Sequence, residues 1–183
     1  MATTRIGKYA CLECERRYLL HGPPPGVPEA GAGWTIIDRY LPNSRLRLRR
    51  MTSMVSGETI YKLTQKYRLP DQDASQATIT NMYLTEAEFA TFQGLPAALI
   101  AKSRFPFESE GQRYSIDVFQ ERHEGLTLAE IELEASAALG SPRMPAFAVA
   151  DVTEDAFFQG GNLALSAPDA FRAGLATRLS AAA

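Results

Sequence analysis

The sequence predicts a mainly β (α+β) protein in which an antiparallel sheet closes on itself, flanked by a few helices that include a C-terminal one. Many short segments rich in β-branched and aromatic residues are separated by turns of Pro, Gly, Asn and Asp, which is typical of a sandwich or barrel. Several segments also carry charges at every second position, the side-chain period of a β-strand. Clear helix signals occur near residues 85–95 and 168–179. The sheet is therefore the main element, and the helices are additions to it.

Five strands are expected in the N-terminal half, at residues 9–19, 34–41, 45–51, 57–69 and 77–83. Residues 21–33 contain four prolines and form a loop between the first two strands. The run that begins at Trp34 is β-branched and aromatic, and Pro42-Asn43 is a turn signal after it. The second and third strands should therefore form a hairpin.

The C-terminal half combines the helix signals with three more strands, at residues 99–107, 113–119 and 128–135. The capping box from Thr85 to Glu88 predicts a helix start, and Phe89, Phe92 and Leu95 follow at helical spacing. Glu110-Gly111 is expected to turn the chain between two of the strands. In the last segment, Pro168 marks a helix start, and its apolar residues lie four apart at Phe171, Leu175 and Leu179. This amphipathic helix should pack on the barrel.

Three of the expected strands place charged residues on one face. They are Glu13, Glu15 and Arg17; Arg45, Arg47 and Arg49; and Glu130, Glu132 and Glu134. Like charges on one face repel one another unless a counter-charge, a metal or an anionic ligand lies between them. A solvated sheet face explains any one of these strands, and Glu13 and Arg17 also have the spacing of a helical ion pair. Together, the three strands favour a face that holds a cation beside a polyanion.

The composition limits the classes of partner. A chain of 183 residues suits one domain, residues 1–183, with a sizeable core. The formal net charge of −2 argues against a dedicated nucleic-acid binder, so the local basic clusters indicate a compact anion. No apolar run approaches the roughly 18 residues of a membrane span, and no signal segment is recognised. With two cysteines in all, the chain is expected to be cytoplasmic.

Cys11 and Cys14 form a CxxC motif that we interpret as accidental. In a strand, residues three apart point to opposite faces and lie about 10 Å apart, which is too far for a disulfide. A zinc site would need two further ligands, and His21 and His123 do not have a matching spacing.

Taken in order, the charged segments resemble the CYTH superfamily, the triphosphate tunnel metalloenzymes. The Glu-x-Glu-x-Lys, Arg-x-Arg and Lys-x-Arg strands of that family resemble Glu13–Arg17, Leu46–Arg49 and Lys102–Arg104, and the lysine of the intervening strand resembles Lys66. The Asp-Val-Phe and Glu-x-Glu segments resemble residues 116–119 and 125–132, and the family's tail resembles residues 151–155 and 162–164. The match runs in order from about Tyr9 to Ala164.

The resemblance implies an eight-stranded antiparallel tunnel with a charged lumen and metal-dependent hydrolysis of a triphosphate, either inorganic or organic. The cations that would bind the triphosphate are Arg47, Arg49, Lys66, Lys102 and Arg104. Mg²⁺ or Mn²⁺, which prefer oxygen ligands, would be held by Glu13, Glu15, Glu130 and Glu132. The implied catalytic set is Glu13, Glu15, Arg17 and Glu132. The partner is a small molecule that contains a triphosphate, and the oligomeric state is open, a homodimer included.

Three departures from the family pattern leave two alternatives open. Arg17 replaces the family's lysine, residues 77–82 lack the usual Glu-x-Glu, and residues 157–161 lack the usual lysines and tyrosine. One alternative is a phosphoanion-binding CYTH domain with weak or lost catalysis. The other is an adenylate cyclase of the CYTH type, although no residue here reads adenine specifically.

Overall fold

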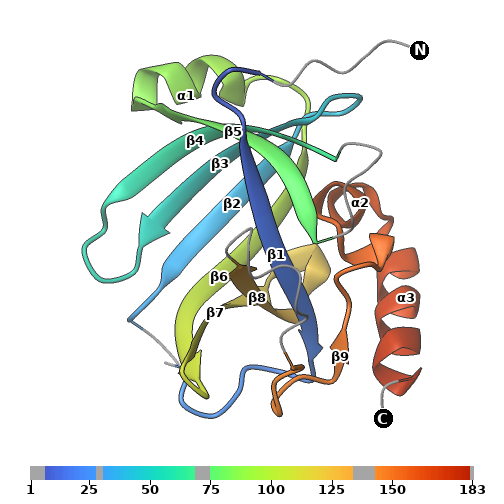
Figure 1. Ribbon diagram of the computed structural model, residues 1–183. Helices are drawn as coiled ribbons and strands as arrows, with labels where there is room; N and C mark the ends of the chain where they lie inside the picture. The colour runs from blue at the N-terminus through green and yellow to red at the C-terminus, as the bar shows by residue number, and fades with distance from the viewer. Residues whose placement is uncertain (1–6, 28–30, 69–74, 134–142, 182–183) are drawn as a thin grey trace.

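The computed structural model describes residues 7–27, 31–68, 75–133 and 143–181. Eight strands of the described chain form a closed antiparallel barrel (Figure 1). They are β1 (Cys11–Leu20), β2 (Trp34–Tyr40), β3 (Leu46–Ser53), β4 (Thr59–Tyr67), β5 (Gln76–Leu84), β6 (Ala98–Ser109), β7 (Gln112–Phe119) and β8 (Thr127–Leu133). The helices are α1 (Glu86–Gln93), α2 (Gly160–Leu165) and α3 (Pro168–Ala181), joined by the two-residue strand β9 (Ala150–Asp151) and the 3₁₀ turns η1 (Glu121–His123) and η3 (Ala156–Phe158).

The barrel closes because β1 pairs along both of its edges. The strand order is β5-β4-β3-β2-β6-β7-β8-β1, and β1 also pairs with β5. The start of β1 pairs with β5, from Cys11 opposite Ile79 to Cys14 opposite Gln76. Its second half pairs with β9 on that side, where Tyr18 lies opposite Asp151. The predicted closed barrel of eight strands is therefore confirmed.

The turns and helix starts follow local sequence rules. Glu110 and Gly111 both have positive φ, 52° and 72°, as a two-residue hairpin turn requires. Thr85 caps α1, and the reciprocal contacts of a capping box with Glu88 are present. The helix ends at Gln93, so Leu95 lies beyond it. Helix α1 packs on the outer wall, where the Phe89 ring lies 4.6 Å from the ring of Tyr61 on β4.

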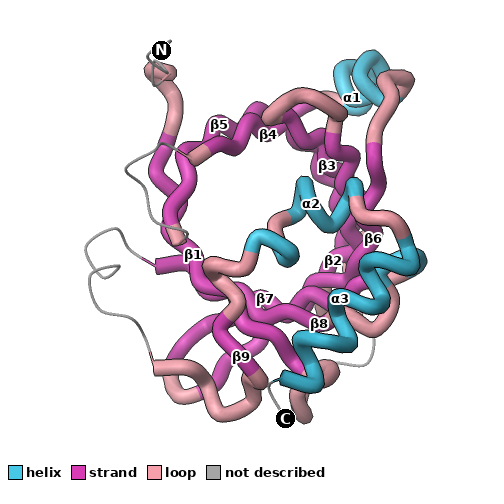
Figure 2. The backbone as a smooth tube through the Cα atoms, turned by 90° about the vertical axis from the view of Figure 1, so that its right-hand side faces the viewer, coloured by secondary structure: helices cyan, strands magenta, loops and turns pink. Residues whose placement is uncertain are grey.

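One end of the barrel is closed by the segment η3–α2, backed by α3. In Figure 2 this segment crosses the interior of the ring of strands. Its side chains Phe158 and Leu163 share a buried core with Leu19 of β1 and Ile100 of β6, and α3 adds Phe171. The remaining members of this core are Phe119, Leu126, Leu128, Val152, Ala164 and Leu175. We call η3–α2 the plug.

The outer wall beside β1, β7 and β8 carries the second core cluster. It contains Tyr18, Ile116 and Ile131, and the partly buried Val27 and Phe147 pack against it. The segments that cover this apolar face are not helical. The predicted packing of α3 on the barrel is confirmed, since Phe171 and Leu175 are buried. Cys11 is exposed and Cys14 is buried, and no disulfide joins them. None of the helices in the described residues is long and apolar enough to cross a membrane.

Candidate functional site

The pleat places all ten residues predicted for the site on the inner face of the barrel. They are Glu13, Glu15, Arg17, Arg47, Arg49, Lys66, Lys102, Arg104, Glu130 and Glu132. Directly paired residues share a face, and the register pairs Glu15 with Glu132 and Arg17 with Glu130. Ion pairs that skip a strand identify this face as the concave one. Lys66 on β4 reaches Glu15 on β1 across β5, and Arg104 on β6 reaches Glu130 on β8 across β7.

Most of these charges form one continuous chain of ion pairs. Its members, in order, are Glu13, Lys66, Glu15, Arg17, Glu130, Arg104, Asp117 and Lys102. Lys66 Nζ lies 2.9 Å from Glu15 Oε1, which also accepts from Arg17 at 2.7 Å. Arg17 Nε lies 3.1 Å from Glu130 Oε1. Acids and bases alternate along the chain, so the repulsion expected on each separate strand is relieved by the neighbouring strands.

Asp38 and Asp117 were not among the residues predicted for the site, yet they orient four of its cations. Arg49 makes a two-point contact with the buried Asp38, at 2.6 and 2.7 Å. Arg47 Nε lies 3.6 Å from Asp38 Oδ1. Asp117 accepts two bonds of 2.6 Å from Arg104 and also pairs with Lys102. Asp117 lies within a segment that the sequence singled out. Asp38 is the only acid in a β-branched run of the sequence. The alternation of side chains along a strand predicts the face on which Asp38 lies, but it does not predict that Arg49 is its partner.

Burial and charge act in opposite directions on these carboxylates. Burial alone would raise the pKa of Glu130, but Arg104, Lys102 and Arg17 hold it well below its usual value. Burial would likewise raise the pKa of Asp38, and Arg49 and Arg47 hold it far below its usual value. For Lys102, burial lowers the pKa against the opposing charge of Asp117. The carboxylates of Glu130 and Asp38 are therefore ionised near neutral pH and act as fixed counter-ions.

Arg17 connects the charged lumen to the plug. Besides its bonds to Glu15 and Glu130, its Nη1 donates to the carbonyl oxygen of Phe158 in η3 at 3.0 Å. Its backbone N–H donates to Thr153 Oγ1 at 3.0 Å. A lysine has no planar fork of five donors. Arg17, which stands where the family pattern has a lysine, therefore contacts β8, Thr153 and η3 at once.

Some sequence expectations differ from the structure. Arg45 does not lie with Arg47 and Arg49, because it precedes β3, is exposed, and places its guanidinium 4.3 Å from the centre of the Tyr67 ring. Glu132 is exposed, and among the described residues it forms no ion pair within 4 Å. Glu134 lies outside the described residues. The inner face of β5 carries Ala77, Ile79 and Asn81, so the carboxylates usual there are missing as the sequence indicated.

Comparison with known proteins supports the fold. No protein-family model matches the chain, and no curated protein matches it significantly. One crystal structure of NE1496, described as a hypothetical protein, is 25% identical with a TM-score of 0.54, covering 84% of this chain and 98% of its own. Another, described as the inorganic triphosphatase NE1496, is 23% identical with a TM-score of 0.54, covering 85% and 96%. PH1819 from Pyrococcus horikoshii OT3 is 16% identical with a TM-score of 0.45, covering 69% and 82%.

The fold is of the CYTH type. In this CYTH-type barrel the carboxylates do not form a ready metal site, because among the described residues no three His, Cys, Asp or Glu side chains are grouped to hold a cation. The chemistry of the donors nevertheless fits a hard divalent cation, since Glu13, Glu15 and Glu132 offer oxygen ligands on one face. Lys66 lies between Glu13 and Glu15 and acts as their counter-ion.

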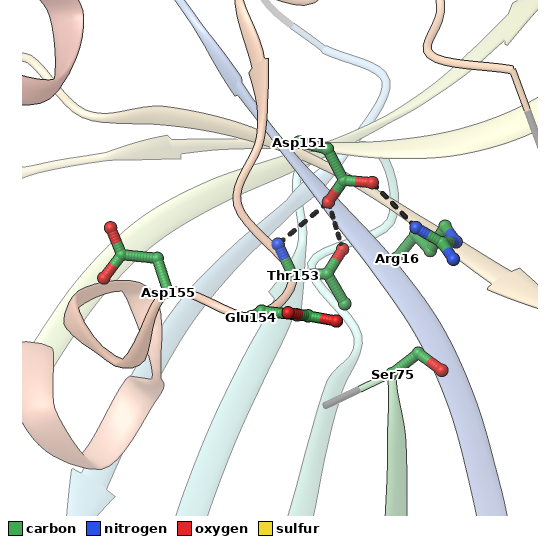
Figure 3. A pocket seen from close by; sticks show the side chains of 6 residues that line it. All are labelled: Arg16, Ser75, Asp151, Thr153, Glu154 and Asp155. Atoms are coloured by element: carbon green, nitrogen blue, oxygen red, sulfur yellow. Dashed lines mark hydrogen bonds and ion pairs between the residues drawn. The ribbon is translucent and has the colours of Figure 1, made fainter. Parts of the chain in front are cut away.

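Two hollows lie next to the CYTH-type barrel. One, of about 330 Å³, is lined by inner-face residues Glu13, Ile79, Asn81 and Glu132 together with Leu12, Cys14 and Leu133. The other, of about 260 Å³, lies where β5 leaves β1 and β9 begins. Figure 3 shows Asp151 there, bonded to Arg16 and Thr153, while Asp155 points away. The first hollow adjoins the charged lumen and extends the candidate site toward Glu132.

Proposed function

We propose that the protein hydrolyses a triphosphate inside the barrel with the help of a divalent metal ion. The observation that carries this proposal is the ion-pair network that joins the strands across the lumen. Together with the pairs that Asp38 forms, it places six cations on the inner face of the barrel: Arg17, Arg47, Arg49, Lys66, Lys102 and Arg104. Such an array suits a compact polyanion whose oxygens can accept several charged hydrogen bonds at once.

The orientation of the arginines supports binding of phosphate oxygens. Asp38 holds Arg49 and Asp117 holds Arg104, each by two bonds, so both forks are fixed before a ligand arrives. Donors that are fixed in advance stabilise developing charge without reorganising. Arg47 Nε is buried and has no hydrogen-bond partner among the described residues. A phosphate oxygen would satisfy this donor.

The charge balance of the network supports a metal ion as co-ligand. Six cations are paired with the five carboxylates Glu13, Glu15, Asp38, Asp117 and Glu130, which leaves one net positive charge. A triphosphate carries several negative charges, so further positive charge is needed. Glu13, Glu15 and Glu132 would hold Mg²⁺ or Mn²⁺, with Glu130 beside them. When bound, the ion neutralises phosphate charge and helps to orient the attacking water.

The chain's own residues would hold and orient the reacting group. Arg47, Arg49, Lys102 and Arg104 would bind the phosphate oxygens and stabilise the charge that the transition state spreads over them. Lys66 would move from Glu13 and Glu15 toward the anion when the metal takes its place. Arg17 would keep Glu15 and Glu130 in position through its bonds to both carboxylates. The plug, which closes one end of the barrel, would limit the entry of water.

A phosphoanion-binding domain with weak or lost catalysis is the second candidate. It is favoured by Ala77 and Ile79, which stand on the inner face where the family pattern has carboxylates. If those carboxylates position water or a second cation, their loss would reduce turnover and leave anion binding intact.

Release of orthophosphate from inorganic and organic triphosphates, with Mg²⁺, with Mn²⁺ and with a chelator, tests the proposal. We expect metal-dependent release, reduced at least about tenfold by Glu132→Gln, as is common when the ligation of a metal is disturbed. The matched control is Glu86→Gln, an exposed residue of α1 that should not change release. Binding without release would favour the second candidate. If the protein neither binds nor hydrolyses any of these triphosphates, both candidate functions are refuted.

A further inference from the structure

Because the plug closes one end of the barrel, a ligand would reach the charged lumen from the other end. It packs on the inner-face residues Leu19, Ile100 and Leu128, and Gly160 lies against Tyr40 at the end of β2. The opposite end is where β2 begins, β3 ends and β4 begins, because neighbouring strands are antiparallel. A ligand that enters there meets this rim first, where Trp34 lies directly opposite Arg104. We call this end the mouth.

The inner face at the mouth is apolar on three consecutive strands. Met51 of β3 lies directly opposite Ile36 of β2 on one side and Ile60 of β4 on the other. Trp34 lies two residues before Ile36 and so belongs to the same face. Trp34, Met51 and Ile60 are each only half-buried, while Ile36 below them is fully buried. Deeper in the lumen the same three strands carry charges, which are Asp38 on β2, Arg49 and Arg47 on β3, and Lys62 on β4.

The spacing between this apolar patch and the cations fits a single elongated ligand. Trp34 is directly opposite Arg104 in the pairing of β2 with β6, which brings their Cβ atoms to about 5 Å. Asp38, which orients Arg49, lies four residues farther along β2, or about 13 Å. An anion held by Arg49 and Arg104 would therefore have its outer end beside the Trp34 ring.

We propose that the patch of Trp34, Met51 and Ile60 binds the organic end of the substrate, and that this substrate is a triphosphate ester carrying an aromatic ring, such as a nucleoside triphosphate. The proposal rests on the function proposed above. The terminal phosphoryl group enters first and lies nearest the plug, while the ring stays at the mouth against Trp34. An inorganic triphosphate would leave the half-buried indole without a ligand, whereas a base would cover it. Stacking on an aromatic side chain does not require a specific base.

The single tryptophan of the chain makes the proposal testable by fluorescence. Adenosine triphosphate should quench or shift the emission of Trp34, whereas inorganic triphosphate should bind with little change. In calorimetric titrations, Trp34→Ala should weaken binding of adenosine triphosphate by about tenfold or more, the usual worth of one stacked base. Binding of inorganic triphosphate should stay within about twofold. Trp34→Phe, which keeps an aromatic ring, should retain most of the wild-type affinity for adenosine triphosphate.

Thr35→Ala is the matched control, because Thr35 is exposed on the opposite face of the same strand. Equal loss of both ligands in Trp34→Ala would overturn the inference, since it would show damage to the barrel and not to a ring site. Binding of inorganic triphosphate without binding of adenosine triphosphate would also overturn it, with the proposed function intact. If neither ligand binds the wild-type protein, the proposed function fails first.

Discussion

At the scale of single residues, Gly160 shows how closely the plug fits the barrel. A Cβ atom at Gly160 would overlap the hydroxyl and ring of Tyr40, whereas at Gly161 it would meet nothing within 4 Å. We expect Gly160→Ala to lower the free energy of unfolding by about 1–3 kcal/mol, the usual cost of overpacking. Gly161→Ala should be neutral or slightly stabilising, because alanine favours a helix. Urea unfolding measures both.

Tyr40→Phe separates a steric cause from a general effect of alanine. It removes the hydroxyl that lies nearest to the added Cβ, so it should recover part of the stability lost by Gly160→Ala. An identical loss for Gly160→Ala in the presence and absence of the Tyr40 hydroxyl would show that the overlap is not the cause.

Asp38 illustrates a buried charge that is kept for orientation. Its side chain is about 2% exposed and is bound by Arg49 at two points. Ion pairs that are removed from water gain little net stability, because desolvation offsets much of their attraction. The pair does, however, fix the direction of the guanidinium. The proposed binding of phosphate oxygens would benefit from a donor that does not move.

At the scale of elements, the strands and two of the helices could be predicted because their signals are local. Alternation of charged and apolar residues marked β1, β3 and β8, and Thr85 with Glu88 marked the start of α1. Most strand ends differ from the predictions by one to three residues. The plug was not predicted, because α2 has six residues, begins with two glycines and has no side-chain cap. It is held by tertiary packing against the barrel.

For the candidate site, the sequence could predict which face of each strand carries the charges, but not how the charges pair. The ten charged residues could be placed on one face, because a period of two fixes the face of each strand. Their pairing could not, since it depends on which strands meet across the lumen. Arg45 follows the same alternation as Arg47, yet it precedes the strand and lies on Tyr67. Asp38 carries no period of its own and becomes recognisable only when β2 is placed beside β3.

His123 should make the docking of the plug depend on pH. Its Nε2 lies 2.9 Å from the carbonyl oxygen of Leu163 in α2, and its ring packs edge-on against Phe171 of α3. Burial lowers its pKa, opposed by the Leu163 bond, with small effects of Arg122 and Glu121. The unfolded chain therefore binds a proton more readily than the folded protein below about pH 6.5. Stability should fall as the pH drops from 7 to 5.5, by at most about 1.4 kcal/mol per pH unit for one proton.

Urea unfolding at pH 7 and at pH 5.5 measures this dependence. His123→Gln cannot take up a proton and should remove most of the slope. The control is His21→Gln, because His21 is the other histidine of the chain and is exposed. A slope that persists in His123→Gln would assign the pH dependence to other groups.

At the scale of the whole molecule, closure of the sheet supplies counter-charges to the three strands that carry charges at every second position. Each strand alone gathers like charges, but the barrel brings acids of β1 and β8 against bases of β4 and β6. The fold therefore keeps cations in a confined space in the absence of a ligand. Their partners are carboxylates that a metal ion could engage, so binding of anion and metal should support each other.

A polyanion should stabilise the whole protein through these cations. A ligand that binds the folded state raises its stability in proportion to the logarithm of ligand concentration above the Kd. We expect the increase in Tm to grow from orthophosphate to diphosphate to triphosphate, because longer anions engage more of the lumen cations at once. Differential scanning calorimetry at matched ionic strength measures the series.

Arg47 and Arg45 form a matched pair that separates lumen binding from general charge effects. Arg47 faces the lumen with a buried Nε that has no hydrogen-bond partner among the described residues, and its 3.6 Å approach to Asp38 is looser than that of Arg49. Arg45 lies two residues away, exposed, over Tyr67. Arg47→Ala should therefore remove much of the triphosphate-induced increase in Tm, whereas Arg45→Ala, which lowers the net charge equally, should keep it. Because exposed charges act weakly through salt water, equal losses in the two variants would mean that triphosphate binds to the surface and not in the barrel.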